Sequence, residues 1–600
     1  MYQTLITAEN SVEIMKLKQQ DRENQEIRKR IYSEIELEGK KGESLLSSLL
    51  RSHIYVNAVC GGNGLCGKCG VRMLFGVTEA TAADRKFFRE EELADGMRLA
   101  CESYPEGRCR IRILSGDEDD FTVVTDGVKP ICGNGELSAD VDQPDLTANF
   151  RYDIAIDIGT TTLAVSLVSC ENAQIIHTVT GVNHQRAYGA DVISRIQAAN
   201  EGHLSELSCC IRQDLYENML RLLHESDTVF AQIRKIAVAG NTTMGHILMG
   251  YSCETLGVYP FKPVDISLTQ VSFADLFETE TAAGNGAADN GHSGHPSHGT
   301  SESFIHGRES TEVILLPGIS AYVGADIAAG LLACGFDRTD QVNVLIDLGT
   351  NGEMAVGNRE KILVTSTAAG PAFEGGNISC GMGSVPGAVS RVEIRDAETA
   401  GSPDGGDDSV RISTGAEARD IVCRTIGGKA PIGLCGTGVI ETVYELLKQE
   451  WMDVTGLLDE AYFDNGFILA ESPTGENIVF TQKDIREVQL AKSAVRAGLE
   501  TLLLRYGVTY SEIGTLYLAG GFGDRIDLRK AAGIGLLPEE LLEKTVAVGD
   551  SALRGVVDFL RDTQSEERLE QLIRVSGEIQ LASDTNFNRF YMEYMLFPEC

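Results

Sequence analysis

Four cysteines near the N-terminus have a spacing that could hold a metal cluster. Cys60, Cys66 and Cys69 follow the pattern C-x5-C-x2-C, and Cys101 lies 32 residues further on. An iron–sulfur cluster takes four thiolate ligands, three of which must here share one tight loop. That loop, CGGNGLCGKCG, has five glycines, which accept positive φ angles and let backbone N–H groups approach sulfur. The spacing is close to the plant-type C-x4-C-x2-C…C pattern and predicts a 2Fe–2S cluster.

Other metal sites are weaker alternatives. A zinc ribbon would favour two CxxC pairs, and this region has one. Cys109 and Cys132 are nearby, but Cys109 falls inside an expected strand and is not expected to be a ligand. Residues 281–303 are low in complexity and contain three histidines. We interpret that segment as a surface insertion, with a metal-binding tract as the alternative.

Two similar strand-to-turn motifs could bind phosphate. DIGTTT begins at Asp157 after the apolar run YDIAI, and DLGTNG begins at Asp347 after VNVLI. Backbone N–H groups and hydroxyls in such turns can bind phosphate oxygens. The predicted phosphate-binding residues are Gly159, Thr160, Thr161, Gly349, Thr350 and Asn351. The two aspartates can hold Mg²⁺ through water, because magnesium keeps several of its waters.

A third glycine motif, LAGGFG, follows a later strand. Its Gly520, Gly521 and Gly523 would let the chain pass flat against an adenine or ribose. Two turns and this third motif in one chain together predict ATP binding, although each alone is an ordinary strand-to-helix turn. Asp326, in YVGADIAAG, could position water or magnesium, or it could be an aspartate at a helix N-terminus.

The elements expected around these residues fall into two groups. Residues 35–115 read as strand, amphipathic helix, strand, cysteine loop and two further strands. From Tyr152 short apolar strands alternate with helical stretches, such as 189–199 and 493–506, which is typical of an α/β architecture. The two similar strand–turn units suggest an internal duplication.

These motifs resemble known families. The run AVCGGNGLCGKCGVRM followed by GMRLAC is similar to the 2Fe–2S domain of the reductive activators of corrinoid proteins. The turns and LAGGFG resemble the actin, sugar kinase and heat-shock chaperone ATPases, in which VGDSALRGVV, near Asp550, matches the helix between the lobes. AGNTTM, PGISAYVGADIAAGL and AAGPAFEGGNISCGMGSVPGA also match the activator family. The resemblance implies an α+β, β-grasp 2Fe–2S domain followed by a two-lobed α/β ATPase.

Changes in composition along the chain suggest domain boundaries, and the same resemblance suggests further residues. The expected parts are an extension (1–34), the 2Fe–2S domain (35–115), a linker (116–150), a first ATPase lobe (151–310) containing the 281–303 insertion, and a second lobe (311–600). Arg186 and Asp191, in NHQRAYGADVISRI, could contact phosphate or partner, but Asp191 could equally cap a helix. Residues 380–387 could touch a partner, although a packed turn is the simpler interpretation.

The implied activity is that of an ATP-hydrolysing reductase. One electron would pass from the 2Fe–2S cluster to Co(II) of a corrinoid protein in a methyltransferase system, restoring Co(I), with a low-potential donor resupplying the cluster. The alternative is a small-molecule kinase, or another ATP-driven electron-transfer activator, with a redox domain. A heat-shock chaperone would need a further peptide-binding domain, and the activators of 2-hydroxyacyl-CoA dehydratases have no ferredoxin domain.

Charge and composition exclude other classes of function. The net charge of −36 argues against binding to nucleic acid or to an anionic membrane, because phosphate would be repelled. Neither a secretion signal nor a membrane-spanning run is expected. Fifteen cysteines then indicate a reducing compartment, and we expect a cytoplasmic location. The sequence also allows a homodimer.

Overall fold

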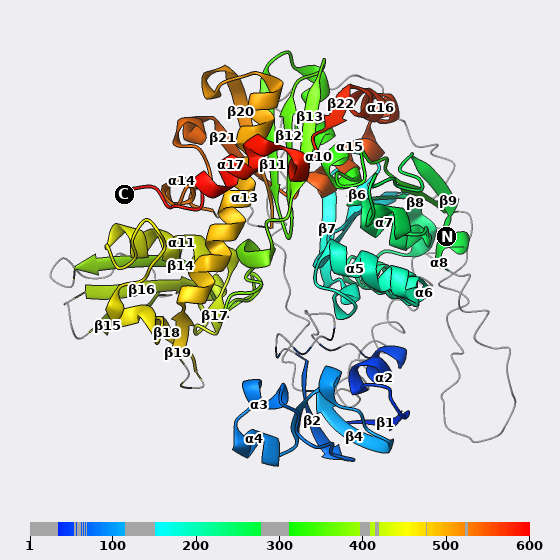
Figure 1. The fold of residues 1–600 in the computed structure, drawn as a ribbon. Helices are drawn as coiled ribbons and strands as arrows, with labels where there is room; N and C mark the ends of the chain where they lie inside the picture. Colours follow the sequence, from blue (N-terminus) through cyan, green and yellow to red (C-terminus); the bar gives the residue numbers. More distant parts are fainter. Residues whose placement is uncertain are drawn as a thin grey trace, which may run out of the picture.

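The computed structural model comprises an N-terminal domain and two larger lobes (Figure 1). It describes residues 34–52, 54, 56, 62, 64, 67, 69–113, 151–277, 311–396, 409–414, 419–473, 475, 477–521 and 526–599. The predictions for the extension, the linker, the 281–303 insertion, Cys60, Cys66 and Gly523 lie outside these residues, apart from Glu34.

The N-terminal domain is an antiparallel sheet with the strand order β1-β4-β2-β3. Its elements are β1 (Ile35–Gly39), α2 (Leu45–Arg51), β2 (Gly70–Phe75), α3 (Asp84–Phe87), α4 (Glu90–Ala94), β3 (Met97–Leu99), the 3₁₀ turn η1 (Ala100–Glu102) and β4 (Gly107–Ile113). Leu45 and Leu49 of α2 are fully buried with Val71 of β2 and Ile111 of β4. The amphipathic spacing of α2 therefore fixes it on the sheet.

The first lobe is a six-stranded sheet with the order β7-β6-β5-β8-β10-β9. Its strands are β5 (Tyr152–Ile158), β6 (Thr162–Ser169), β7 (Ile175–Val182), β8 (Ile233–Gly240), β9 (Thr269–Ser272) and β10 (Glu312–Leu315), and its helices are α5 (Val192–Ala198), α6 (Leu204–Glu225), α7 (Thr242–Met249) and α8 (Phe273–Phe277). β5, β6 and β7 form an antiparallel meander, and β8 runs parallel to β5.

The second lobe has a six-stranded sheet with the order β21-β20-β11-β12-β13-β22. Five strands repeat the arrangement of the first sheet, and the sixth, β22, lies beside β13, at the edge opposite to that of β9. Its strands are β11 (Val342–Leu348), β12 (Gly352–Gly357), β13 (Ile362–Thr367), β20 (Ile513–Gly520), β21 (Thr545–Gly549) and β22 (Ser576–Glu578), flanked by α13 (Gln482–Tyr506), α14 (Leu528–Gly533) and α17 (Thr585–Glu593). Again the first three strands form an antiparallel meander, and β20 runs parallel to β11. The repeated order confirms the predicted duplication.

A smaller subdomain extends the second lobe. Its sheet has the order β15-β16-β14-β17. The elements are β14 (Ala388–Asp396), β15 (Ser409–Thr414), β16 (Arg419–Thr425), β17 (Gly433–Leu434), α11 (Gly436–Lys448), α12 (Glu460–Phe463) and the hairpin of β18 (Phe467–Glu471) and β19 (Asn477–Phe480).

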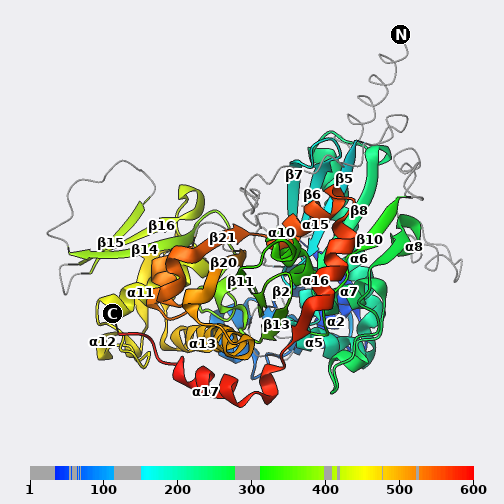
Figure 2. The ribbon, with the colours of Figure 1, turned by 90° about the horizontal axis from the view of Figure 1, so that it is seen from above.

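Two helices join the lobes. α10 (Ala325–Ala333) and α15 (Ser551–Arg561) lie against each other between the two large sheets, with α16 (Ser565–Val575) beside them (Figure 2). Their apolar side chains share one buried cluster with Ala155 of β5 and Leu345 of β11. At Gly555 of α15 an added Cβ would lie 2.0 Å from the carbonyl oxygen of Ala329, so only glycine fits this crossing. The expected connecting helix is therefore confirmed.

One predicted boundary is wrong. The first lobe was expected to end at residue 310, but Glu312–Leu315 forms β10, which pairs in parallel with β8 of the first sheet. The strand belongs to the first sheet because its apolar residues extend that sheet beside β8. The low-complexity segment separates it in sequence from the rest of the lobe, so the boundary was placed too early. Within the described part of the chain, no helix has the length and apolar character needed to cross a membrane.

Candidate functional site

Two of the predicted cluster ligands lie side by side. Cys69 directly precedes β2, Cys101 lies in η1 after β3, and their Sγ atoms are 3.3 Å apart without a disulfide bond. Both thiols are buried, and the hydrogen bond with Cys101 lowers the pKa of Cys69 to about 7. A lowered pKa favours the thiolate, which is the form that binds metal. The side chains of Cys60 and Cys66 are outside the described residues.

Described glycines show how the cysteine loop is held near this pair. Gly62 and Gly67 have φ angles of 83° and 71°, as the tight loop requires. A Cβ on Gly62 would lie 3.8 Å from the Cβ of Cys101, so this glycine lies next to that cysteine. Adjacent thiols with a glycine beside them fit a 2Fe–2S cluster. Cys109 is buried within β4, where burial raises its pKa, and it is not part of the pair.

The two predicted phosphate-binding turns face each other across the lobes. Thr161 lies between β5 and β6, and Thr350 lies between β11 and β12. Their hydroxyl oxygens are 3.2 Å apart, although the residues are separated by 189 positions in the sequence. The fold thus brings the two predicted phosphate-binding turns together.

A set of buried polar side chains holds the first turn in shape. The amide of Asn183 donates to the carbonyl oxygen of Gly159 (2.9 Å), and that of Asn241 donates to the hydroxyl of Thr160 (3.1 Å). Arg195, which is fully buried, donates to the carbonyl oxygen of Thr160. Burial lowers the pKa of Arg195 to about 10. The sequence did not single out these three side chains, although all of them fall in stretches that were marked there.

Asp191 is a helix cap. Its carboxylate accepts from the backbone N–H of Ser194 (2.8 Å) at the start of α5. This supports the capping alternative over a contact with phosphate. Arg186 lies on the 3₁₀ turn before it, His184–Ala187.

Four aspartates gather at the junction of the lobes. Asp157 and Asp347 end β5 and β11, Asp326 begins α10, and Asp550 caps α15 by accepting from the N–H of Leu553 (2.7 Å). Burial, and then the charges of the other three aspartates, raise the pKa of Asp157. Burial, followed by Asp326 and Asp550, raises that of Asp347 to about 8. Mutual repulsion of this kind is relieved by a cation.

Two observations bear on a cation at this cluster. One carboxylate oxygen of Asp157 is buried and has no hydrogen-bond partner among the described residues. In the same part of the chain, no three His, Cys, Asp or Glu side chains are arranged to ligate a metal ion directly. Asp326 stands at the N-terminus of α10, as one of its two interpretations predicted, and its charge helps to raise the pKa of Asp157 after burial and Asp550.

Asp550 was missed as a site residue. The duplication was the available signal, because VGAD at the start of α10 resembles VGD directly before α15. Burial raises the pKa of both Asp326 and Asp550 to about 6. Two further acids, Glu353 of β12 and Glu374, also lie in this region, and burial raises the pKa of each.

The third glycine motif lies beside the second turn. Gly520 pairs with Leu348 at the ends of β20 and β11. Its φ is 118°, and an added Cβ would lie 2.2 Å from the carbonyl oxygen of Leu348. A Cβ on Gly521 would meet nothing within 4 Å, which leaves an open surface there. In the second turn itself, the N–H of Gly349 donates to the carbonyl oxygen of Asn351 (3.0 Å).

Residues 380–387 form a packed turn, as the simpler interpretation predicted. The N–H of Val479 donates to the sulfur of Cys380 (3.3 Å). The backbone of Leu434 bonds to both Cys380 and Met382. These contacts hold the segment on the small subdomain.

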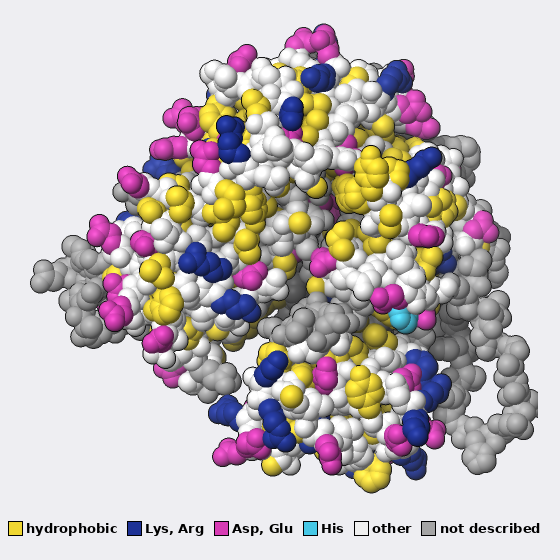
Figure 3. All heavy atoms as spheres, in the orientation of Figure 1, with side chains coloured by type: hydrophobic (Ala, Val, Ile, Leu, Met, Phe, Trp, Pro, Cys, Tyr) yellow, Lys and Arg dark blue, Asp and Glu magenta, His cyan; other side chains and the backbone are white. Residues whose placement is uncertain are grey.

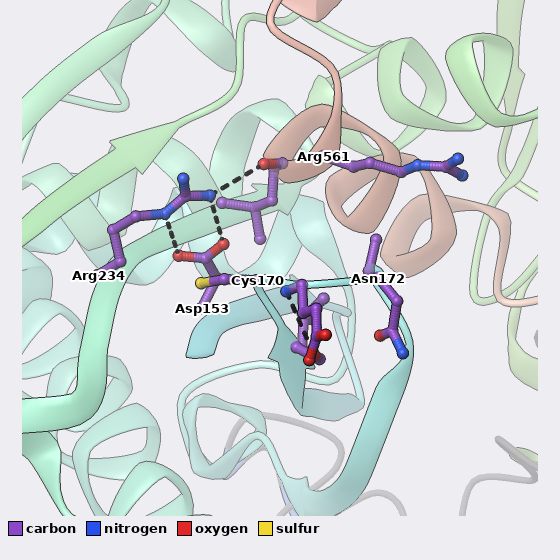
Figure 4. Close-up of a pocket in the computed structure, with 10 residues that line it drawn as sticks. Asp153, Cys170, Asn172, Arg234 and Arg561 are labelled. Carbon is purple, nitrogen blue, oxygen red and sulfur yellow. Dashed lines mark hydrogen bonds and ion pairs between the residues drawn. The ribbon is translucent and has the colours of Figure 1, made fainter. Parts of the chain in front are cut away.

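A cavity of about 210 Å³ lies elsewhere, between the β6–β7 turn and the end of α15 (Figure 4). Here the guanidinium of Arg234 donates to both oxygens of buried Asp153 (3.0 and 2.7 Å) and to the carbonyl oxygen of Leu560 (3.3 Å). Burial raises the pKa of the adjacent Cys170 to about 12. Asp153 is near the start of β5, whereas Asp157 is near its end. The contacts of Arg234 therefore link the first sheet to α15 at the end of β5 opposite to the phosphate-binding turn.

Comparisons with known proteins agree with these features. The family model described as the 2Fe–2S iron–sulfur cluster binding domain matches residues 30–106. The model of the RACo middle region matches residues 152–284. The model of the C-terminal domain of RACo, the ASKHA domain, matches residues 341–600. ASKHA denotes the actin, sugar kinase and heat-shock chaperone fold.

Similar proteins cover most of the chain. The corrinoid activation enzyme RamQ of Eubacterium limosum is 28% identical over 93% of this chain and 97% of its own length. The Co(II) methylated amine-specific corrinoid protein reductase of Methanosarcina barkeri is 25% identical over 74% of this chain and 76% of its own. A solved reductive activator for corrinoid, iron–sulfur protein is 25% identical, with a TM-score of 0.64, over 93% of this chain and 96% of that one.

Fold and site together define an iron–sulfur ATPase of the ASKHA class. The chain belongs to the RACo family of reductive activators of corrinoid proteins.

Proposed function

We propose that this protein reactivates a corrinoid protein by ATP-dependent reduction. One electron passes to Co(II) of the partner and restores Co(I), while ATP is hydrolysed to ADP and phosphate. The observation that carries this proposal is that one chain holds both the adjacent thiols of Cys69 and Cys101 and two Gly–Thr turns whose Thr161 and Thr350 hydroxyls meet. Relatives named as a corrinoid activation enzyme and a corrinoid protein reductase support it.

The energetics explain why both halves are needed. A plant-type 2Fe–2S cluster has a potential of about −400 mV, and Co(I) requires a stronger reductant. For one electron, each ~59 mV uphill lowers the equilibrium constant about tenfold. ATP can close this gap only if the lobes bind the corrinoid partner differently with and without nucleotide. α10 and α15, packed between the lobes, are the elements that such a closure would move.

Each group of residues has a proposed role. Cys60, Cys66, Cys69 and Cys101 hold the cluster, which supplies one electron when bound. The two Gly–Thr turns bind the phosphates, and Gly520 and Gly521 face adenosine. Asp157 and Asp347 hold Mg²⁺ through water, which offsets the repulsion among the acids. The cysteine content fits a cytoplasmic protein that takes electrons from a low-potential donor.

The test is anaerobic purification followed by ultraviolet–visible and electron paramagnetic resonance spectroscopy. A Co(II) corrinoid protein from a methyltransferase system, a reductant and Mg–ATP are then added. We expect a reduced 2Fe–2S signal and Co(I) formation that depends on ATP. A cluster without ATP-dependent cobalt reduction would overturn the proposed activity, and zinc in place of iron would overturn the electron carrier.

A further inference from the structure

A carboxylate occupies the point where the two phosphate-binding turns meet. Oε2 of Glu374 accepts from the hydroxyl of Thr350 (2.8 Å) and from that of Thr161 (3.3 Å). Glu374 follows β13 and therefore belongs to the second lobe, together with Thr350, whereas Thr161 belongs to the first. One carboxylate oxygen thus bridges the lobes.

This bridge uses the donors that a phosphate would need. A threonine hydroxyl has one hydrogen, so it cannot donate fully to Glu374 and to a phosphate oxygen at the same time. Carboxylate and phosphate oxygens are both anionic acceptors of such hydrogen bonds. If Thr161 and Thr350 bind ATP, Glu374 must first give up these contacts.

Charge also prevents Glu374 and a phosphate from occupying this point at the same time. Glu374 lies close enough to Asp347 for its charge to help raise the pKa of that aspartate, after the larger effects of burial, Asp326 and Asp550. A polyphosphate placed beside Glu374 would meet the same repulsion. A phosphate and the Glu374 carboxylate therefore cannot both occupy the point where the two hydroxyls meet.

The backbone fixes Glu374 in this position. It ends the 3₁₀ turn Pro371–Glu374, and Gly375 follows with a φ of 79°. A Cβ on Gly375 would lie 2.3 Å from the carbonyl oxygen of Met382, so the turn is packed tightly behind the carboxylate. The same segment continues to Ser379, whose N–H donates to Asp484 of α13 (2.7 Å). A shift of the Glu374 backbone would therefore be transmitted to α13 of the second lobe.

We propose that Glu374 is a latch that substitutes for phosphate in the nucleotide-free cleft. It holds the two turns together, and the phosphates of ATP displace it. It is a positioning residue that weakens ATP binding and makes release of the latch a step of the ATP cycle. This inference rests on the proposed ATP site.

The test compares Glu374→Gln and Glu374→Ala with the wild-type protein. Calorimetry gives the Kd of a non-hydrolysable Mg–ATP analogue and of adenosine, which has no phosphate. Both variants should bind the analogue at least about tenfold more tightly, because a bridge to a charged group no longer has to be broken. Their affinity for adenosine should stay within about twofold. Glu360→Gln, on the exposed β12–β13 turn, is the matched control and should change neither Kd.

Three other results would overturn the proposed role of Glu374. Unchanged affinity for the analogue with lost hydrolysis would assign Glu374 to the attacking water. Equal changes for the analogue and adenosine would indicate general damage to the cleft. Equal affinity of the wild-type protein for adenosine and for the analogue would show that the two turns do not bind phosphate. Failure of cobalt reduction alone would contradict the proposed function and leave the latch intact.

Discussion

At the scale of single residues, ionisation of the Asp347 carboxyl lowers the folding stability of the protein when no nucleotide is added. Burial and neighbouring acids raise its pKa from 3.8 to about 8. Between these values the folded state binds more protons than the unfolded state, so stability falls as pH rises through this window. Asp347→Asn should raise the Tm of the nucleotide-free protein, and the gain should grow from pH 6 to pH 8.5. Differential scanning fluorimetry at several pH values measures it.

The same substitution should remove activity. Loss of the carboxylate that we propose holds Mg²⁺ through water should lower ATP turnover about a hundredfold or more. Asp340→Asn is the control, because Asp340 is exposed and pairs with Arg359 on the surface of the same lobe (2.7 Å). A gain in Tm that does not depend on pH would contradict the electrostatic explanation.

The thiol pair makes a separate prediction. Cys69→Ser and Cys101→Ser should each lower the iron and sulfide content of the anaerobically purified protein and abolish its visible absorption. The buried Cys109 in β4 provides the control. Cys109→Ala should keep the cluster, with some loss of stability from the small cavity. Full iron content in either serine variant would mean that another residue replaces the thiolate.

At the scale of elements, the crossing of α10 and α15 depends on one glycine. A Cβ at Gly555 would lie 2.0 Å from the carbonyl oxygen of Ala329, so Gly555→Ala must push the helices apart. We expect a loss of about 1–3 kcal/mol in stability. ATP-dependent cobalt reduction should fall further than ATP turnover, because the lobes are coupled here. Thermal unfolding and the two activities measure these effects.

Another helical glycine supplies the matched control. A Cβ at Gly245 in α7 would meet only Leu315, at an ordinary 3.6 Å. Gly245→Ala should therefore be neutral or stabilise the helix by about 0.5–1 kcal/mol. Similar losses in both variants would show that alanine in a helix, and not the crossing, is the cause.

Elements and turns could be predicted because their signals are local. Thr161 and Asp347 fall at the end of apolar strands, where a few adjacent residues carry the pattern. Glu374 could not be predicted, because its contact with Thr161 spans 213 positions and follows only from the closed arrangement of the two sheets. Arg195 was missed for a related reason: an arginine on a short helix looks exposed until the fold buries it beneath the first turn.

At the scale of the whole molecule, charge is unevenly distributed. The chain carries a net charge of −36, and acidic side chains are spread over both lobes in Figure 3. The N-terminal domain presents basic and acidic side chains together in the same view, and Arg108, Arg110 and Arg112 on β4 pair with acids on or beside β1. The iron–sulfur domain therefore has a more balanced surface charge than the chain as a whole.

The presence of the cluster and the ATPase in one chain should increase the rate of Co(I) formation. Covalent linkage keeps the cluster near the ATPase at an effective concentration of about 1 mM. Two full-length variants separate the functions: Cys69→Ser/Cys101→Ser lacks the cluster, and Asp347→Asn lacks ATP turnover. Mixed at about 1 µM each, they should form Co(I) at below about 1% of the wild-type rate, because each must find the other by diffusion. Absorbance of Co(I) follows the reaction.

Recovery of Co(I) formation in the mixture of the two variants would indicate transfer between chains. If the mixture reached half of the wild-type rate, the cluster of one chain would be serving the ATPase of another, as an exchanging dimer would allow. Raising both variants to about 100 µM distinguishes the cases, since a diffusional encounter gains with concentration and a preformed dimer does not. A mixture of each variant with the wild-type protein is the control, and it excludes inhibition by the variant itself.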